Sequence, residues 1–134
     1  MRRSLSTTLA GAAAVLLLST AACSSGTAEV ETVDAPQAVD IIEAGEHTVI
    51  DVRTPAEYAA GHVDGAENID VTAATFEQQV EKLDKDEEYV VYCQSGNRSA
   101  QAADKMAELG FTEIVDGGGI VDLQSAGADI GAGG

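Results

Sequence analysis

Short runs of β-branched and aromatic residues alternate along this chain with segments of helical periodicity. The runs that indicate strands lie at residues 48–52, 66–71, 88–93 and 112–118. The segments that indicate helices lie at residues 36–45, 54–61, 72–83, 98–110 and, as a last turn, 119–127. Strands that alternate with helices favour a parallel sheet with helices on both faces. We therefore predict a single three-layer α/β domain.

Residues 1–23 have the pattern of an export signal. Met1-Arg2-Arg3 is a short basic start, Leu9–Leu18 is apolar, and small residues lead to Cys23. The apolar run is shorter than the ~20 residues that a membrane span needs. The segment resembles a bacterial lipoprotein signal, although Thr20 stands where such signals usually carry leucine. The alternative is an ordinary secretory signal that is cleaved nearby.

The lipoprotein resemblance implies that residues 1–22 are removed and that Cys23 becomes lipidated. The protein would then be exported and anchored to the cell membrane through the lipid only, facing outside the cytoplasm. Residues 23–32 are small and polar and are interpreted as a flexible tether. The Gly/Ala-rich residues 127–134 are predicted to be a disordered tail.

The chain is strongly acidic. All 23 acidic residues follow Cys23 but only five of the seven basic ones do, a net charge of −18 for that part. Such a surface repels nucleic acid and anionic lipids, so neither is expected as a partner. Residues 33–126 are enough for one hydrophobic core, and we expect a monomer. If Cys23 is lipidated, Cys93 has no partner within the chain and a disulfide is excluded.

Cys93 ends the strongest predicted strand and is followed by the polar loop Gln94-Ser95-Gly96-Asn97-Arg98-Ser99. In open α/β sheets, ligands gather at the C-terminal ends of strands. A glycine-containing loop before a helix can turn several backbone N–H groups toward an anion. Such a loop, with Arg98 nearby, stabilises a thiolate over a thiol. We therefore predict that Cys93 is a nucleophile; the alternative is a buried structural cysteine.

Two motifs of this chain resemble the single-domain rhodaneses, a family of sulfurtransferases. They are VIDVRTPAEYAAGHVDGAENI at residues 49–69 and VVYCQSGNRSAQAA at residues 90–103, and the resemblance covers nearly all of residues 33–126. The matching positions are Asp51-Val52-Arg53, Glu57-Tyr58, Gly61-His62-Val63, Gly65-Ala66, Asn68-Ile69, Cys93, Gly96, Arg98 and Ser99. The chain departs from the family near its C-terminal end, where Leu123 stands near the place of a usual tryptophan.

The resemblance implies a rhodanese-like fold and covalent sulfur transfer. Cys93 would take the outer sulfur of a small anion such as thiosulfate, carry it as a persulfide and pass it to cyanide or a thiol. The backbone amides of residues 94–99 would hold the sulfur anion, and Arg98 would help position the donor. No metal or organic cofactor is expected, because two scattered histidines and one free cysteine do not form a recognisable metal site.

The polar residues of the first motif are interpreted as support for the site. Asp51, Arg53 and Glu57 are expected to form a structural ion-pair and hydrogen-bond group beside the pocket. His62 is expected to anchor a turn rather than to act as a base.

Two other functions compete with sulfur transfer. Phosphatases of this fold place five residues between cysteine and arginine, whereas four residues separate Cys93 from Arg98. This shorter loop suits a sulfur atom and crowds a phosphate. The second alternative is a non-catalytic or redox-sensing binding module at the cell surface, in which the thiol reports oxidants through sulfenic acid chemistry.

Overall fold

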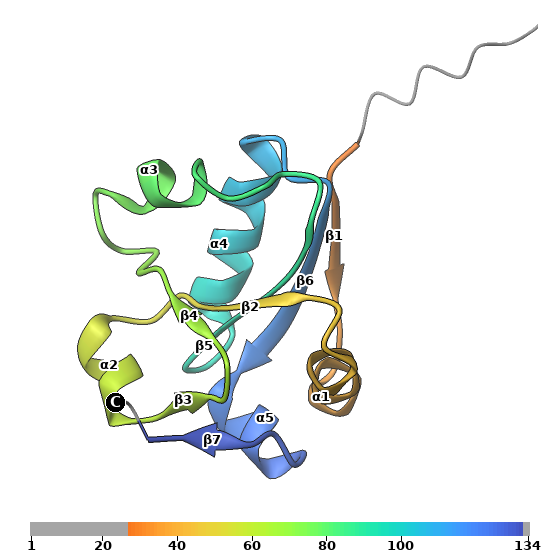
Figure 1. The fold of residues 1–134 in the computed structure, drawn as a ribbon, viewed down its shortest axis with the longest axis vertical. Coiled ribbons are helices and arrows are strands. Elements are labelled where there is room, and N and C mark those ends of the chain that lie inside the picture. The colour runs from red at the N-terminus through yellow and green to blue at the C-terminus, as the bar shows by residue number, and fades with distance from the viewer. Residues whose placement is uncertain (1–26, 133–134) are drawn as a thin grey trace, which may run out of the picture.

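The computed structural model describes residues 27–132 (Figure 1). The predictions of a signal peptide and of lipidation at Cys23 concern residues outside this range. The elements are β1 (Glu29–Thr32), α1 (Ala35–Ala44), β2 (Thr48–Asp51), α2 (Pro55–Ala60), β3 (His62–Val63), β4 (Glu67–Asn68), α3 (Phe76–Val80), β5 (Glu88–Cys93), α4 (Asn97–Glu108), β6 (Glu113–Gly119), α5 (Ile120–Ser125) and β7 (Ile130–Gly131). None of the helices in this range is long and apolar enough to cross a membrane.

A five-stranded parallel sheet forms the centre of the domain, in the order β1-β6-β5-β2-β4. Helices cover both of its faces, with α3 and α4 on one side and α1 and α5 on the other (Figure 1). The predicted α/β architecture is therefore confirmed. Because all five strands run the same way, their C-terminal ends meet at one edge, where ligands bind in such sheets.

The central strand β5 divides its side chains between the two cores. Tyr89, Val91 and Cys93 join the core under α3 and α4, whereas Val90 and Tyr92 join the core under α1 and α5. This alternation follows from the two-residue period of a strand. The side chain of Cys93 is therefore directed to the α4 side, toward the helix that begins directly after its loop.

The ends of α1 and α2 follow from their sequences. Asp34 and Thr54 each begin a helix with a capping box, in which the third helical residue, Gln37 or Glu57, bonds back to the cap. Gly45 ends α1 with a φ of 73°, a left-handed conformation that glycine adopts without steric strain. The helix predicted over residues 72–83 is shorter in the structure, because turns flank Phe76–Val80 on both sides.

The predicted tether and tail are both corrected in part by strand pairing. Residues 29–32 form β1, which pairs with β6 from Glu113 to Asp116, so these four residues are no flexible tether. Residues 130–131 form β7, which pairs antiparallel with β3, so the tail is ordered at least to this point. Both strands are held by backbone hydrogen bonds and bury little side-chain surface, and for this reason hydrophobic periodicity did not reveal them.

The end of β6 lies against the loop that follows Cys93. Cys93 pairs with Gly119 across the sheet, and one extra residue on β6 between Asp116 and Gly119 separates this pair from the regular register. A Cβ atom on Gly119 would lie 2.6 Å from the Gln94 carbonyl oxygen and 3.0 Å from the Ser95 Cα. Only glycine permits this approach of two backbones, so Gly119 sets the position of the loop from the opposite strand.

We expect Gly119→Ala to displace residues 94–95 and to reduce the free energy of unfolding by about 1–3 kcal/mol, as overpacking does. Urea denaturation measures the loss, and backbone amide chemical shifts locate the displacement. Gly45→Ala is the matched control, because it strains a left-handed residue by about 1–2 kcal/mol and has no neighbour within 4 Å of the added carbon. If the amide chemical shifts of residues 94–99 do not change in Gly119→Ala, Gly119 does not set the position of the loop.

Candidate active site

The sulfur of Cys93 lies inside the turn that joins β5 to α4. The Gly96 amide donates a hydrogen bond to Cys93 Sγ at 2.9 Å. Gly96 has a φ of 97°, and this left-handed conformation turns the chain back over the sulfur before α4 begins at Asn97. The side chain of Cys93 is fully buried. The lone thiol is thus held at the N-terminal end of a 12-residue helix.

The environment of Cys93 favours its ionised form. Burial raises the pKa of the thiol, but hydrogen bonds from the amide and hydroxyl of Ser99 and from the amides of Gly96 and Ser95 lower it further than burial raises it. The net effect is a pKa below the ordinary value of a cysteine. The positive end of the α4 dipole acts in the same direction. Cys93 therefore has the electrostatic environment of a reactive thiolate.

The six loop residues, 94–99, contribute unequally to the stabilisation of the Cys93 sulfur. Of the amides predicted to hold the sulfur, those of Ser95, Gly96 and Ser99 act on it. Ser99 Oγ donates to the Gly96 carbonyl oxygen at 2.9 Å and can rotate its single proton to an ionised sulfur. Gln94 and Asn97 have exposed side chains. The hydroxyl of Ser99 is a contribution that the sequence analysis did not anticipate.

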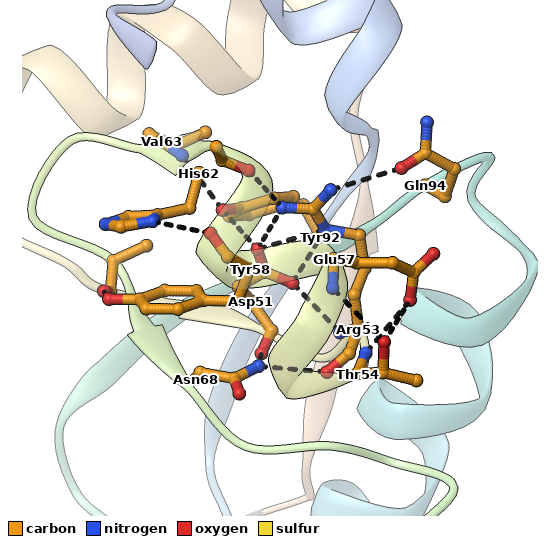
Figure 2. Close-up of polar contacts among 12 residues, drawn as sticks. Asp51, Arg53, Thr54, Glu57, Tyr58, His62, Val63, Asn68, Tyr92 and Gln94 are labelled. Carbon is orange, nitrogen blue, oxygen red and sulfur yellow. Dashed lines mark hydrogen bonds and ion pairs between the residues drawn. The ribbon is translucent and has the colours of Figure 1, made fainter. Parts of the chain in front are cut away.

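Beside the loop, the guanidinium of Arg53 forms a buried ion pair with Asp51 (Figure 2). Arg53 Nε lies 3.0 Å from both carboxylate oxygens, and Nη2 lies 2.6 Å from Asp51 Oδ2. Nη2 also donates to the Gly61 carbonyl oxygen, and Nη1 donates to Gln94 Oε1 at 3.1 Å. Tyr92 donates its hydroxyl proton to Asp51 Oδ2 at 2.8 Å. The pair therefore ties β2 and β5 to the first residue of the active-site loop.

Glu57 does not join this pair, and the expected three-residue group is corrected. Its carboxylate pairs instead with Arg98, with both Nη–Oε distances at 2.8 Å. The Arg98 hydrogen bonds, together with those from Thr54, lower the pKa of Glu57 to about 2 against the opposing effect of burial. The Arg98 guanidinium, expected to be available to a donor, is therefore already engaged by a carboxylate.

His62 is the first residue of β3, directly after the turn at Gly61 that ends α2. Its ring stacks on Tyr58 with centroids 3.7 Å apart, and Nδ1 lies 3.0 Å from the Tyr58 carbonyl oxygen (Figure 2). Tyr58 in turn donates its hydroxyl proton to the Ala66 carbonyl oxygen at 2.6 Å. These contacts hold the turn that carries the Gly61 carbonyl to Arg53. Within residues 27–132, no three His, Cys, Asp or Glu side chains converge as a metal site requires.

Besides the Ser99 hydroxyl, three features of the site were not identified from the sequence. Gly119 supports the loop from β6, Tyr92 carries the Asp51 network across the sheet, and Glu57 pairs with Arg98 from another element. The repeated glycines at 117–119 were a visible signal for a close backbone approach. The pairing of Glu57 with Arg98 joins residues 41 positions apart, and no local pattern indicates it.

Comparison with known proteins agrees with this geometry. The family model described as the rhodanese-like domain matches residues 34–125, well over half of the chain. The chain belongs to the rhodanese-like family. The solved structure of a rhodanese-related protein from Thermoplasma volcanium superposes with a TM-score of 0.66 at 28% identity, covering 76% of this chain and 98% of that one. A structure titled rhodanese with anions from E. coli has a TM-score of 0.56 at 33% identity, covering 65% and 99%.

Several curated relatives of this rhodanese-like chain are named thiosulfate sulfurtransferases. It is 38% identical over 80 residues to the thiosulfate sulfurtransferase PspE of Escherichia coli, covering 60% of this chain and 76% of that protein. It is 33% identical over 93 residues to the thiosulfate sulfurtransferase GlpE of Pseudomonas putida, covering 67% and 82%. These likenesses support sulfurtransferase activity for the domain.

We expect Ser99→Ala to raise the pKa of Cys93, because the variant loses a hydroxyl donor to the thiolate and keeps the amide. Titration of the thiolate ultraviolet absorbance measures this pKa. Ser95→Ala is the matched control, since Ser95 acts on the sulfur through its amide alone. If the pKa of Cys93 is the same in the wild type and in Ser99→Ala, the Ser99 hydroxyl does not stabilise the thiolate.

Proposed function

We propose that this protein moves a sulfane sulfur from a small anionic donor such as thiosulfate, through a persulfide on Cys93, to cyanide or a thiol. The observation that carries this proposal is the buried sulfur of Cys93, which accepts a hydrogen bond from the Gly96 amide at 2.9 Å at the N-terminal end of α4. The amides of Ser95 and Ser99 also lower the pKa of this thiol. A sulfur atom with so many donors is stabilised as an anion. That is the form in which it attacks a donor and the form in which it carries the transferred sulfur.

The transfer divides into two displacements at sulfur. In the first, the Cys93 thiolate attacks the outer sulfur of thiosulfate, the S–S bond of the donor breaks, and sulfite leaves with the bonding electron pair. In the second, cyanide or a thiolate attacks the terminal sulfur of the Cys93 persulfide, and the thiolate of Cys93 leaves. No proton or electron is lost in either step. The loop amides offset the negative charge on sulfur in both half-reactions.

The geometry of the loop favours sulfur over phosphate. Four residues separate Cys93 from Arg98, and the Gly96 amide reaches the cysteine sulfur itself at 2.9 Å. A phosphatase loop must instead surround a whole phosphate group beyond the sulfur.

A non-catalytic or redox-sensing module remains the alternative. The likeness to relatives named thiosulfate sulfurtransferases favours catalysis over this role. Stoichiometric persulfide formation separates the two roles, since a sensor need not accept sulfur from a donor.

We further propose that the protein is exported and anchored to the membrane by lipid on Cys23, so that transfer takes place outside the cytoplasm. The proposal rests on the basic, apolar and small-residue order of residues 1–23. The acidic charge of the rest of the chain suits a domain that is held near a membrane without binding its anionic lipids.

Thiosulfate should add the mass of one sulfur atom to the purified domain, and Cys93→Ser should abolish both this adduct and transfer to cyanide. The serine hydroxyl is close in size to the thiol but far less acidic, so the fold should be retained. Intact-mass spectrometry and thiocyanate formation provide the two readings. Wild-type protein that gains no sulfur while folded would overturn the proposal.

Expression of the full chain should give a protein that partitions into the detergent phase, with a mature N-terminus at residue 23. The Cys23→Ala variant should be lost from the detergent phase or remain unprocessed, because residue 23 then has no thiol to carry the lipid. Phase separation and N-terminal mass mapping test this. A mature N-terminus elsewhere would indicate ordinary secretion.

A further inference from the structure

Glu57 and Arg98 form a bidentate ion pair at the N-terminal end of α4, the helix that follows Cys93. Each Nη of Arg98 donates to a different oxygen of Glu57 at 2.8 Å, and both side chains are about one-third exposed or less. Glu57 Oε2 also accepts from the amide and the hydroxyl of Thr54, each at 3.0 Å. The carboxylate is thus fixed by α2 and holds the guanidinium in one place.

The pair lies beside the loop that holds the reacting sulfur, because Arg98 stands in the first turn of α4, two residues after Gly96, whose amide donates to Cys93 Sγ at 2.9 Å. Glu57 is the main cause of the raised pKa of Arg98, and Cys93 and Asp70 also raise it. The other arginine near the loop, Arg53, is neutralised by Asp51. The three described lysines lie toward the other end of α4: Lys105 stands in its last turn with its ammonium over the Phe76 ring of α3, Lys82 follows α3, and Lys85 donates to the Leu109 carbonyl oxygen.

The charges around Cys93 therefore leave no free cation for a donor among the contacts of residues 27–132. Arg98 is balanced by Glu57, and Asp70 adds a further negative charge nearby. The part of the chain after Cys23 has a net charge of −18, which adds a long-range repulsion for anions. What remains to favour an anion is the set of backbone amides around the sulfur, which recognise one sulfur atom and not a second charged group.

We propose that Glu57 determines donor specificity: by neutralising Arg98, it makes the site favour singly charged organic persulfides over the dianion thiosulfate. This inference rests on the proposed function, because it assumes that Cys93 accepts a sulfane sulfur. The Cys93 thiolate attacks the terminal sulfur of an ionised persulfide, the S–S bond breaks, and the organic thiolate leaves with the electron pair. One negative charge enters and one leaves, whereas thiosulfate brings two charges and sulfite removes two.

The test compares kcat/KM for thiosulfate with kcat/KM for 2-hydroxyethyl persulfide at low ionic strength. Glu57→Gln should raise the ratio of thiosulfate to persulfide about fivefold, because one negative charge beside the donor is removed and Arg98 is released. Glutamine at this position still completes the capping box with Thr54, so α2 should keep its N-terminus. A purely structural role would change both constants together and leave the ratio unaltered.

Two further variants serve as controls. Glu46→Gln makes the same change in total charge at an exposed residue just before β2, at the edge of the sheet opposite Cys93, and should leave the ratio unchanged. Glu57→Gln combined with Arg98→Gln removes both charges and should return the ratio close to the wild-type value. This double variant separates neutralisation from any direct contact between Arg98 and thiosulfate.

A ratio that stays constant or falls in Glu57→Gln would overturn the inference, as would an equal rise in Glu46→Gln. A double variant with a ratio far below that of the wild type would also overturn it, since Arg98 would then bind thiosulfate while paired. Failure of the proposed function looks different: neither donor would place a sulfur on Cys93 of the wild-type protein.

Discussion

The buried ion pair between Asp51 and Arg53 joins the parts of the molecule that surround Cys93. Asp51 ends β2 and accepts from Tyr92 of β5, while Arg53 reaches the Gly61 carbonyl oxygen and the Gln94 side chain. Two charges without contact to water are unfavourable unless their remaining hydrogen-bonding groups are satisfied. Here four structural segments supply those bonds, so the pair is stable only when the sheet, the turn before β3 and the active-site loop are in place together.

The two arginines near Cys93 show how differently the same side chain is used. Arg53 is buried and fixes backbone segments, whereas Arg98 is partly exposed and links α2 to the first turn of α4. Neither presents an unpaired charge to the sulfur. The thiolate is stabilised instead by backbone amides and by the Ser99 hydroxyl, whose partial charges are positioned by the loop itself.

Local sequence patterns were sufficient to predict the layers of the fold and the position of Cys93 at the end of a strand before a helix. The alternation of Val90 and Tyr92 with Val91 and Cys93, and the caps at Thr54 and Gly45, are short-range features that a sequence shows directly. The pairing of Glu57 with Arg98 and the approach of Gly119 to Gln94 are not of this kind. They depend on how distant segments meet, and β1 and β7 were missed because backbone hydrogen bonds rather than buried side chains hold them.

Holding a thiolate with amides rather than with a free cation has a consequence for turnover. A free guanidinium beside Cys93 would attract an incoming dianion, but it would retain the leaving anion as strongly and slow its release. Uniform binding of substrate and product in this way does not accelerate the chemical step. Amides that reach only the sulfur act on the atom whose charge changes during transfer. The arrangement of this loop, with Arg98 balanced by Glu57, therefore places its electrostatic stabilisation on the reacting atom and leaves the rest of the donor free to depart.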